Sequence, residues 1–185
     1  MSTAAAAAAD FGDTSLFTAS KDSQAIMPGS EFFGEIEAFL YFEAELMDSH
    51  AYDSWHALWE PGGLYWVPCN HADLDPNQSV SIIYEHTDQL GDRIFRLKDK
   101  RMHSQSPKSR LIRIISNISV TTSGASDILV FSNFILGEAR AGQQQSLFGR
   151  ATHRLKQGPD GFKIAGKKVY LINNDAPMRN VTFLL

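Results

Sequence analysis

The spacing of hydrophobic residues changes near residue 109, and this change limits the folds that the chain can adopt. Before it, Phe32, Ile36 and Leu40 follow the three-and-four spacing of an amphipathic helix, predicted over residues 31–47 with Ser30 as its N-cap. After it, long segments such as "SRLIRIISNISVTTS" and "QSLFGRATHRLKQ" alternate apolar and polar side chains, as strands do. Helices followed by strands predict an α+β fold, with the N-terminal helices packed on one concave face of a strongly curved, mainly antiparallel sheet that forms a cone.

The residues between this helix and the first long strand predict shorter elements. A second helix begins at Asp48 or Ser49, reaches Trp59 and ends at "EPGG", because proline and paired glycine cannot continue a helix. The aromatic and β-branched segment "LYWVPC" predicts a strand. A short apolar stretch over residues 80–84 follows, and Asp88 is expected to cap a third helix.

The alternation within the strands predicts which side chains share a face of the sheet. Ile112, Ile114, Ile118 and Val120 are expected on one face of the first long strand, and Arg113 on the other. The glycine inside "FKIAGKKVYLIN" predicts a bulge or bend, and "GPDG" predicts a tight hairpin turn.

A chain of 185 residues fits one domain of ordinary size. Residues 1–29 are rich in alanine and then in small polar residues, so they bury little apolar surface and are predicted to form a mobile arm. Residues 30–185 are expected to form the single α+β cone domain.

Charge and composition argue against several classes of protein. The net charge of −4 disfavours a nucleic-acid binder, which usually has a basic excess. The single cysteine, Cys69, rules out an internal disulfide and cysteine-based zinc sites, and a buried structural thiol is expected there. No apolar run approaches the ~20 residues of a membrane span. The first residues lack a basic, leucine-rich secretory leader, so a cytoplasmic location is expected.

Five segments in this order resemble the small (beta) subunit of aromatic-ring-hydroxylating dioxygenases. They are "FLYFEAELMDSHAYDSWHALW", "YWVPCN", "SIIYEHTDQLGDRIFRLK", "SQSPKSRLIRIISNISV" and "VYLINNDAPMRNVTFLL". The resemblance runs from about Phe32 to the last residue. It implies a fold like that of nuclear transport factor 2, also called cystatin-like.

The same resemblance implies a partner and cofactors outside this chain. In the family, a large (alpha) subunit carries a Rieske 2Fe-2S cluster and a mononuclear iron and adds dioxygen to an arene as a cis-dihydrodiol. The small subunit mainly holds together an assembly of three alpha and three beta chains, which implies beta–beta contacts as well. Electrons come from a reductase, sometimes through a ferredoxin.

The residues of this chain do not supply the iron ligands that such oxidation needs. A Rieske centre takes two cysteines and two histidines, and the chain has one cysteine. A mononuclear iron site takes two histidines and a carboxylate. His50 and His56 are six residues apart and fall on different faces of a helix, and the "HAD" triplet of His71 and Asp73 has no second histidine nearby. We therefore expect no metal, cofactor or catalytic residue in this chain.

An alternative function is a cofactor-free dehydratase, isomerase or cyclase, with an acid–base site inside the cone. The candidate side chains are Asp48, His50, Tyr52, Tyr65, Asp88 and His153. In this alternative, Asp48 and His153 are the acid–base pair. His153 is expected inside the cone because it shares an alternating face with Leu147 and Leu155. The simpler interpretation of His153 is a core histidine hydrogen-bonded to a neighbour. A third option is a non-enzymatic, homo-oligomeric binding module.

The segment from Tyr84 to Arg110 mixes acidic and basic side chains, which is unlike a phosphate-binding stripe. Arginine suits partly buried ion pairs and bidentate carboxylate contacts, so the cluster predicts an intersubunit surface. The alternative is a solvated helix face with weak surface pairs. The residues assigned to the surface are Tyr65, Trp66, Arg93, Arg96, Arg110 and Arg113.

Overall fold

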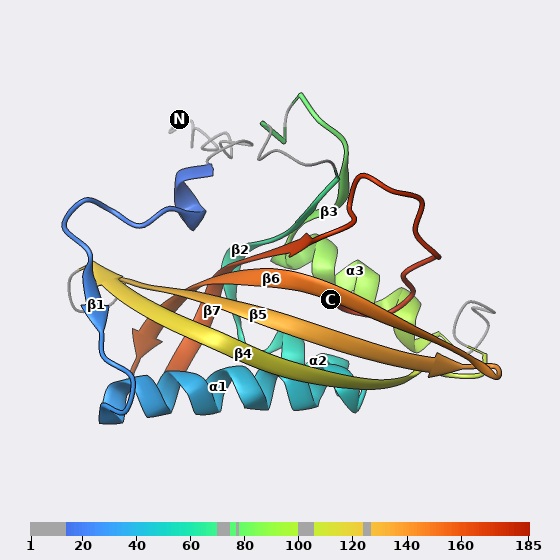
Figure 1. Cartoon of the computed structure of the whole chain (residues 1–185), viewed down its shortest axis with the longest axis horizontal. Helices are drawn as coiled ribbons and strands as arrows, with labels where there is room; N and C mark the ends of the chain where they lie inside the picture. The colour runs from blue at the N-terminus through green and yellow to red at the C-terminus, as the bar shows by residue number, and fades with distance from the viewer. Residues whose placement is uncertain (1–13, 70–74, 77, 100–105, 124–126) are drawn as a thin grey trace, which may run out of the picture.

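The computed structural model describes residues 14–69, 75–76, 78–99, 106–123 and 127–185, and it confirms the α+β class (Figure 1). The helices are the 3-10 turn η1 (Thr14–Phe17), α1 (Glu31–Asp48), α2 (Tyr52–His56) and α3 (Thr87–Lys98). The strands are β1 (Gln24–Ile26), β2 (Trp59–Pro68), β3 (Ser81–His86), β4 (Arg110–Ser123), β5 (Asp127–Arg140), β6 (Gln143–Gly158) and β7 (Gly161–Leu171).

The seven strands form one curved sheet in the order β1-β4-β5-β6-β7-β2-β3. Every neighbouring pair is antiparallel except β2 and β7, which are parallel. Helix α1 runs along the sheet beside β4 (Figure 1). The sheet is therefore mainly antiparallel, as the alternation predicted, and helix α1 covers its inner face.

The main core lies between α1 and the inner face of the sheet. Ile36 and Leu40 of α1 are fully buried there, and the rings of Trp55, Trp59 and Tyr65 pack edge-to-face at centroid distances of 5.3 to 5.9 Å. Ser30 caps α1, with its hydroxyl accepting from the backbone N–H of Phe33 at 3.3 Å. The prediction for the first helix is thus confirmed to within one residue.

The second and third helices differ from the predictions at their ends. Helix α2 ends at His56, and Trp59 already belongs to β2, where it pairs with Ile164. The "EPGG" segment is an irregularity within the pairing of β2 with β7, because the next paired residue of β2 is Leu64. Helix α3 begins at Thr87, so Asp88 lies in its first turn and His86 is the N-cap residue.

The predicted faces of β4 are wrong for its first half. Asn117 has a φ of +53°, and the pairing of β4 with β5 shifts register between Ser116 and Ser119. Such a bulge inserts one residue and exchanges the two faces of the strand. Ile112 and Ile114 are consequently 65% and 59% exposed, whereas Val120, beyond the bulge, is buried as expected.

A mobile arm was expected over residues 1–29. Residues 1–13 lie outside the described residues, and residues 14–29 differ from that expectation. Strand β1 extends the sheet by pairing with β4, and Phe17 of η1 packs on Trp66 at a ring-centroid distance of 6.0 Å. Gly166 permits this approach, since a Cβ there would lie 2.9 Å from Leu16 and 3.1 Å from the Phe17 ring. The segment thus covers one end of the outer face of the sheet, where Phe17, Leu64 and Trp66 form a second, small core.

Replacing Phe17 by alanine should lower the free energy of unfolding by about 2 to 4 kcal/mol, because it leaves a cavity over Trp66. The measurement is urea denaturation at neutral pH. Met27→Ala is the control, since this side chain is 72% exposed and should change stability by less than about 0.5 kcal/mol. Equal stability of both variants would show that residues 14–29 do not pack stably on the sheet.

Candidate functional site

The interior of the cone contains a buried cluster of charged and polar side chains contributed by α1, β6 and β7. His153 of β6 and Lys167 of β7 are directly paired in the sheet, and Glu43 of α1 lies opposite them. The Nε2 of His153 donates to Oε2 of Glu43 at 2.9 Å, and the Nζ of Lys167 donates to Oε1 at 2.8 Å. The three side chains are only 1 to 3% exposed, so they are stabilised by one another rather than by water.

Trp55 completes the coordination of the Glu43 carboxylate. Its indole Nε1 donates to Oε1 at 3.0 Å, so this oxygen accepts from both Trp55 and Lys167. A buried carboxylate with three donors is well satisfied, which a buried charge requires.

Burial and charge act in opposite directions on the pKa of Glu43. Burial by itself raises the pKa of this carboxyl group, but the ammonium of Lys167 and the ring of His153 outweigh burial and hold the pKa well below its usual range. Burial lowers the pKa of Lys167, and the Glu43 carboxylate only partly offsets that effect. The cluster therefore holds Glu43 as a carboxylate and is not suited to passing a proton to and from it near neutral pH.

Asp48 is held by a different partner. It accepts from the backbone N–H of Arg113 at 2.8 Å and from the guanidinium of the same residue. The guanidinium also donates to the backbone carbonyl of Leu184. Asp48 and His153, the pair expected for an acid–base site, are thus engaged separately, one with Arg113 and the other with Glu43.

The last described residues close the cone. Phe183, Leu184 and Leu185 are buried in the main core. The hydroxyl of Tyr65 donates to the backbone oxygen of Leu185 at 2.8 Å and accepts from its N–H at 2.9 Å. Burial raises the pKa of Tyr65, while its bond to Leu185 lowers the pKa by a smaller amount, so the phenol stays neutral.

Among the described residues, the cavity beside the charged cluster is too small for an organic substrate. The cavity lined by Glu43, His153, Lys167 and Leu185 has a volume of about 20 Å³. That is enough for about one water molecule, whereas small-molecule sites typically measure roughly 300 Å³ or more. His153 does point into the cone, as expected, and it fits the simpler interpretation of a core histidine bonded to a neighbour.

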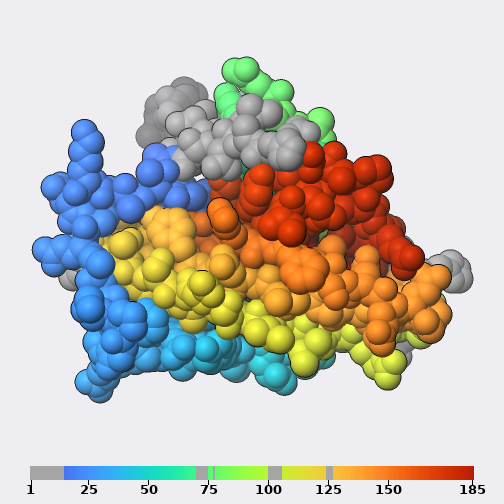
Figure 2. All heavy atoms as spheres, viewed as in Figure 1, coloured from blue at the N-terminus to red at the C-terminus, as the bar shows by residue number. Residues whose placement is uncertain are grey.

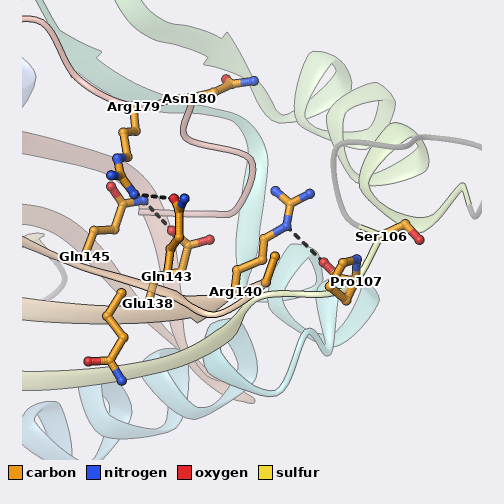
Figure 3. Close-up of a pocket in the computed structure, with 10 residues that line it drawn as sticks. Ser106, Pro107, Glu138, Arg140, Gln143, Gln145, Arg179 and Asn180 are labelled. Atoms are coloured by element: carbon orange, nitrogen blue, oxygen red, sulfur yellow. Dashed lines mark hydrogen bonds between the residues drawn. The ribbon is translucent and has the colours of Figure 1, made fainter.

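A larger hollow lies on the surface at the β5–β6 hairpin and has a volume of about 280 Å³ (Figure 3). Its lining is polar. The Nη1 of Arg179 donates to Gln143 at 2.7 Å, and the Nε of Arg140 donates to the backbone oxygen of Pro107 at 3.0 Å. Both arginines are thus engaged within the chain, and none of the described residues that line the hollow is a histidine or a cysteine.

The structure places the six residues expected at an intersubunit surface in different environments. Tyr65 and Trp66 are buried within the chain, and Arg113 is held by Asp48, so these three do not present a surface to a partner. The guanidinium of Arg93 forms a bidentate pair with Glu85, both bonds being 2.7 Å long. Arg96 and Arg110 are exposed, and their role at an interface stays a prediction.

The other sequence candidates have structural contacts. The ring of His50 bonds the hydroxyl of Tyr52 at 2.7 Å and the carbonyl of Ser109 at 2.8 Å, and His56 bonds the carbonyl of Thr87 at 2.8 Å. Asp88 is exposed in α3. Within the described residues no three histidine, cysteine, aspartate or glutamate side chains gather as metal ligands, and His71 and Asp73 lie outside those residues.

Sequence reasoning did not identify Glu43 and Lys167 as a charged pair. The signal for Glu43 was present, because it follows the spacing of the buried residues Ile36, Leu40 and Met47 on α1. Lys167 was hidden by the irregularity between Ile164 and Gly166, which shifts the pairing of β7 with β6 and places Lys167 on the inner face.

Replacing Glu43 by glutamine should lower the free energy of unfolding by about 3 to 5 kcal/mol, because it leaves Lys167 as an unpaired buried charge. Urea denaturation at pH 7 measures the effect. Glu43→Gln combined with Lys167→Met removes the buried charge as well, so the double variant should be more stable than Glu43→Gln alone. If the double variant lost as much free energy of unfolding as Glu43→Gln and Lys167→Met lose together, the result would contradict the pairing.

The stability of the fold should fall as the pH drops below about 4.5, the ordinary pKa of glutamate. The pKa of Glu43 is lower in the folded chain than in the unfolded chain, so the unfolded chain takes up the proton first and acid favours unfolding. Urea denaturation between pH 6 and pH 3 tests this. Glu43→Gln should show a smaller loss over the same range, and an identical loss would assign the acid sensitivity to other carboxylates.

Comparison with known proteins agrees with the fold and the interior described above. Residues 42–177 match the family model described as "Ring hydroxylating beta subunit". The small subunit of a 2-halobenzoate 1,2-dioxygenase from Burkholderia cepacia is 32% identical over 146 residues, which cover 76% of this chain and 88% of that protein.

Solved structures have the same architecture. The crystal structure of the beta subunit of a benzoate 1,2-dioxygenase from Burkholderia mallei has a TM-score of 0.69 and 26% identity, and the match covers 86% of this chain and all of that one. A protein from Novosphingobium aromaticivorans, described as NTF2-like with a cystatin-like fold, has a TM-score of 0.54 at 14% identity, covering 77% of this chain and 83% of that one. The expected fold is therefore confirmed. The chain belongs to the family of ring-hydroxylating beta subunits.

Proposed function

We propose that this chain is the structural small subunit of a multicomponent aromatic-ring-hydroxylating dioxygenase. In this proposal a large (alpha) subunit carries the Rieske 2Fe-2S cluster and the mononuclear iron and cis-dihydroxylates the arene, with electrons from a reductase or ferredoxin. Three alpha and three beta chains form the assembly. The low cysteine content suits the reducing cytoplasm in which we place it.

The observation that carries the proposal is the filled interior of the cone. His153 and Lys167 both bind the Glu43 carboxylate, Leu185 with Tyr65 closes the interior, and the cavity that the described residues leave beside this cluster is too small for an arene. One cysteine cannot provide the two that a Rieske cluster takes from its protein. Both points favour a supporting role over the alternative of an acid–base enzyme using Asp48 and His153.

The contact with the large subunit is proposed to involve the exposed face of α3. Phe95 is 70% exposed, and Arg96 beside it is exposed as well. An exposed aromatic next to an arginine is typical of the residues that contribute most to binding at protein interfaces. None of the described helices is long and apolar enough to cross a membrane.

Co-expression with a large subunit of the family should yield one complex that contains both chains and absorbs as an iron–sulfur protein. The small subunit purified alone should convert no aromatic substrate. Turnover by the small subunit alone would contradict the proposal and favour the acid–base alternative.

Phe95→Ser with Arg96→Glu should weaken capture of the large subunit by about tenfold or more, because both changes remove or oppose a contact at an exposed surface. Thermal unfolding should be little changed, since neither side chain is in the core. Asp160→Ala, at the exposed β6–β7 turn, is the matched control. Unchanged capture by the Phe95/Arg96 variant would place the contact elsewhere.

A further inference from the structure

The inner face of the sheet continues beyond the core as the polar hollow at the β5–β6 hairpin, which we call the hairpin hollow. Glu138 and Arg140 of β5 and Gln143 and Gln145 of β6 line one side of it. Glu138 pairs with Gln145, and Arg140 pairs with Gln143, so these four side chains share one face. It is also the face of His153, since Gln145 and His153 are an even number of residues apart on β6.

The segment that leads to the buried Leu184 and Leu185 lines the other side of the hairpin hollow. Arg179 and Asn180 belong to this segment. The space-filling view shows the segment, in red, lying against the orange strands of the hairpin (Figure 2). The hollow thus lies where two parts of the chain meet that are far apart in the sequence.

Two guanidinium groups meet at the hairpin hollow. Nη1 of Arg179 donates to Oε1 of Gln143 at 2.7 Å, and Gln143 is the strand partner of Arg140, so both arginines flank the same amide (Figure 3). Within the part of the chain that the structure describes, Arg179 has one hydrogen-bond partner, Gln143, and no ion-pair partner. A guanidinium has five N–H donors, so Arg179 keeps donors for a ligand.

Glu138 is the one acidic residue among the described residues that line the hairpin hollow. It is 9% exposed, and both of its carboxylate oxygens accept hydrogen bonds. Oε1 accepts from the hydroxyl of Ser109 at 2.5 Å, and Oε2 accepts from the amide of Gln145. Two arginines and one carboxylate give the lining one net positive charge, which favours a ligand with a single negative charge over a dianion.

We infer that the hairpin hollow binds a small organic monocarboxylate, whose carboxylate is held by Arg179 and Arg140. Guanidinium groups match the two oxygens of a carboxylate, and such charge-assisted hydrogen bonds are stronger than neutral ones. The amide of Asn180 offers a donor and an acceptor, and Pro107 offers an apolar surface to the body of the ligand. The volume of about 280 Å³ limits the ligand to a small one.

A carboxylate held there joins the hairpin to the segment that closes the cone. Arg140 already contacts this segment, since its Nη1 lies 3.5 Å from Oγ1 of Thr182. A ligand that binds only the folded chain stabilises that chain by mass action. Binding should therefore raise the melting temperature of the full chain as the ligand concentration rises.

This inference does not rest on the proposed function, because its test needs only the full chain by itself. Isothermal titration with sodium benzoate, a planar monocarboxylate, should show saturable binding of one ligand per chain. Benzamide, which has a similar shape and no charge, should bind at least about tenfold more weakly, and inorganic phosphate should compete at least about tenfold less well.

Arg179→Gln should weaken benzoate binding by about tenfold or more, and Arg179→Lys should fall between the two because it keeps the charge and loses the planar fork. Arg150→Gln is the matched control. It removes the same charge from an exposed position on the outer face of β6 and should bind benzoate as the unaltered chain does. Circular dichroism and thermal unfolding without ligand separate a lost site from a lost fold.

The inference is overturned if the full chain shows no saturable binding of benzoate, or if benzamide or phosphate binds as tightly. It is also overturned if Arg179→Gln binds benzoate as the unaltered chain does, or if Arg150→Gln loses as much affinity as Arg179→Gln.

Capture of the large subunit by the same variants distinguishes this inference from the proposed function. A chain that binds benzoate but captures no large subunit contradicts only the proposed function. If Arg179→Gln abolishes capture and the unaltered chain binds no benzoate, the hairpin hollow holds an acidic side chain of the partner, and only the inference fails.

Discussion

The carboxylate of Glu43, bound by Lys167, His153 and Trp55, is the interaction on which the interior of this protein depends. It joins α1 to the adjacent strands β6 and β7 and thus fixes the helix against the curved sheet. A buried charge is tolerated only when its partners are in place, because each partner left alone would carry the full cost of desolvation. The cluster therefore specifies one position of α1 on the sheet.

The same interaction makes Glu43 poorly suited to acid–base chemistry. A catalytic acid or base needs a pKa near the working pH and space for a substrate. Lys167 and His153 instead keep the pKa of Glu43 low, and the bond between Tyr65 and Leu185 closes the remaining space. The interior around Glu43 is therefore packed, with a cavity of only about 20 Å³.

The surfaces that we propose for partner binding are on the outside of the cone. The bulge at Asn117 turns Ile112 and Ile114 outward, and the N-terminal segment covers only one end of the outer sheet face. The exposed faces of α1 and α3 carry aromatic side chains next to charged ones. A subunit of a larger assembly requires exposed surfaces for its partners, and the exposed apolar side chains lie on different elements of this chain.

The sequence by itself determined the fold class, the first helix, the long strands and the family, because hydrophobic spacing and motif order are local properties that can be read along the chain. It also placed His153 inside the cone by its alternation with Leu147 and Leu155. Only the tertiary structure decided that Lys167 and Arg113 point inward and that Ile112 points outward, because one bulge or register shift exchanges the faces of a strand. It alone joined Glu43 to Lys167, 124 residues apart, since pairing between distant residues depends on how the elements pack.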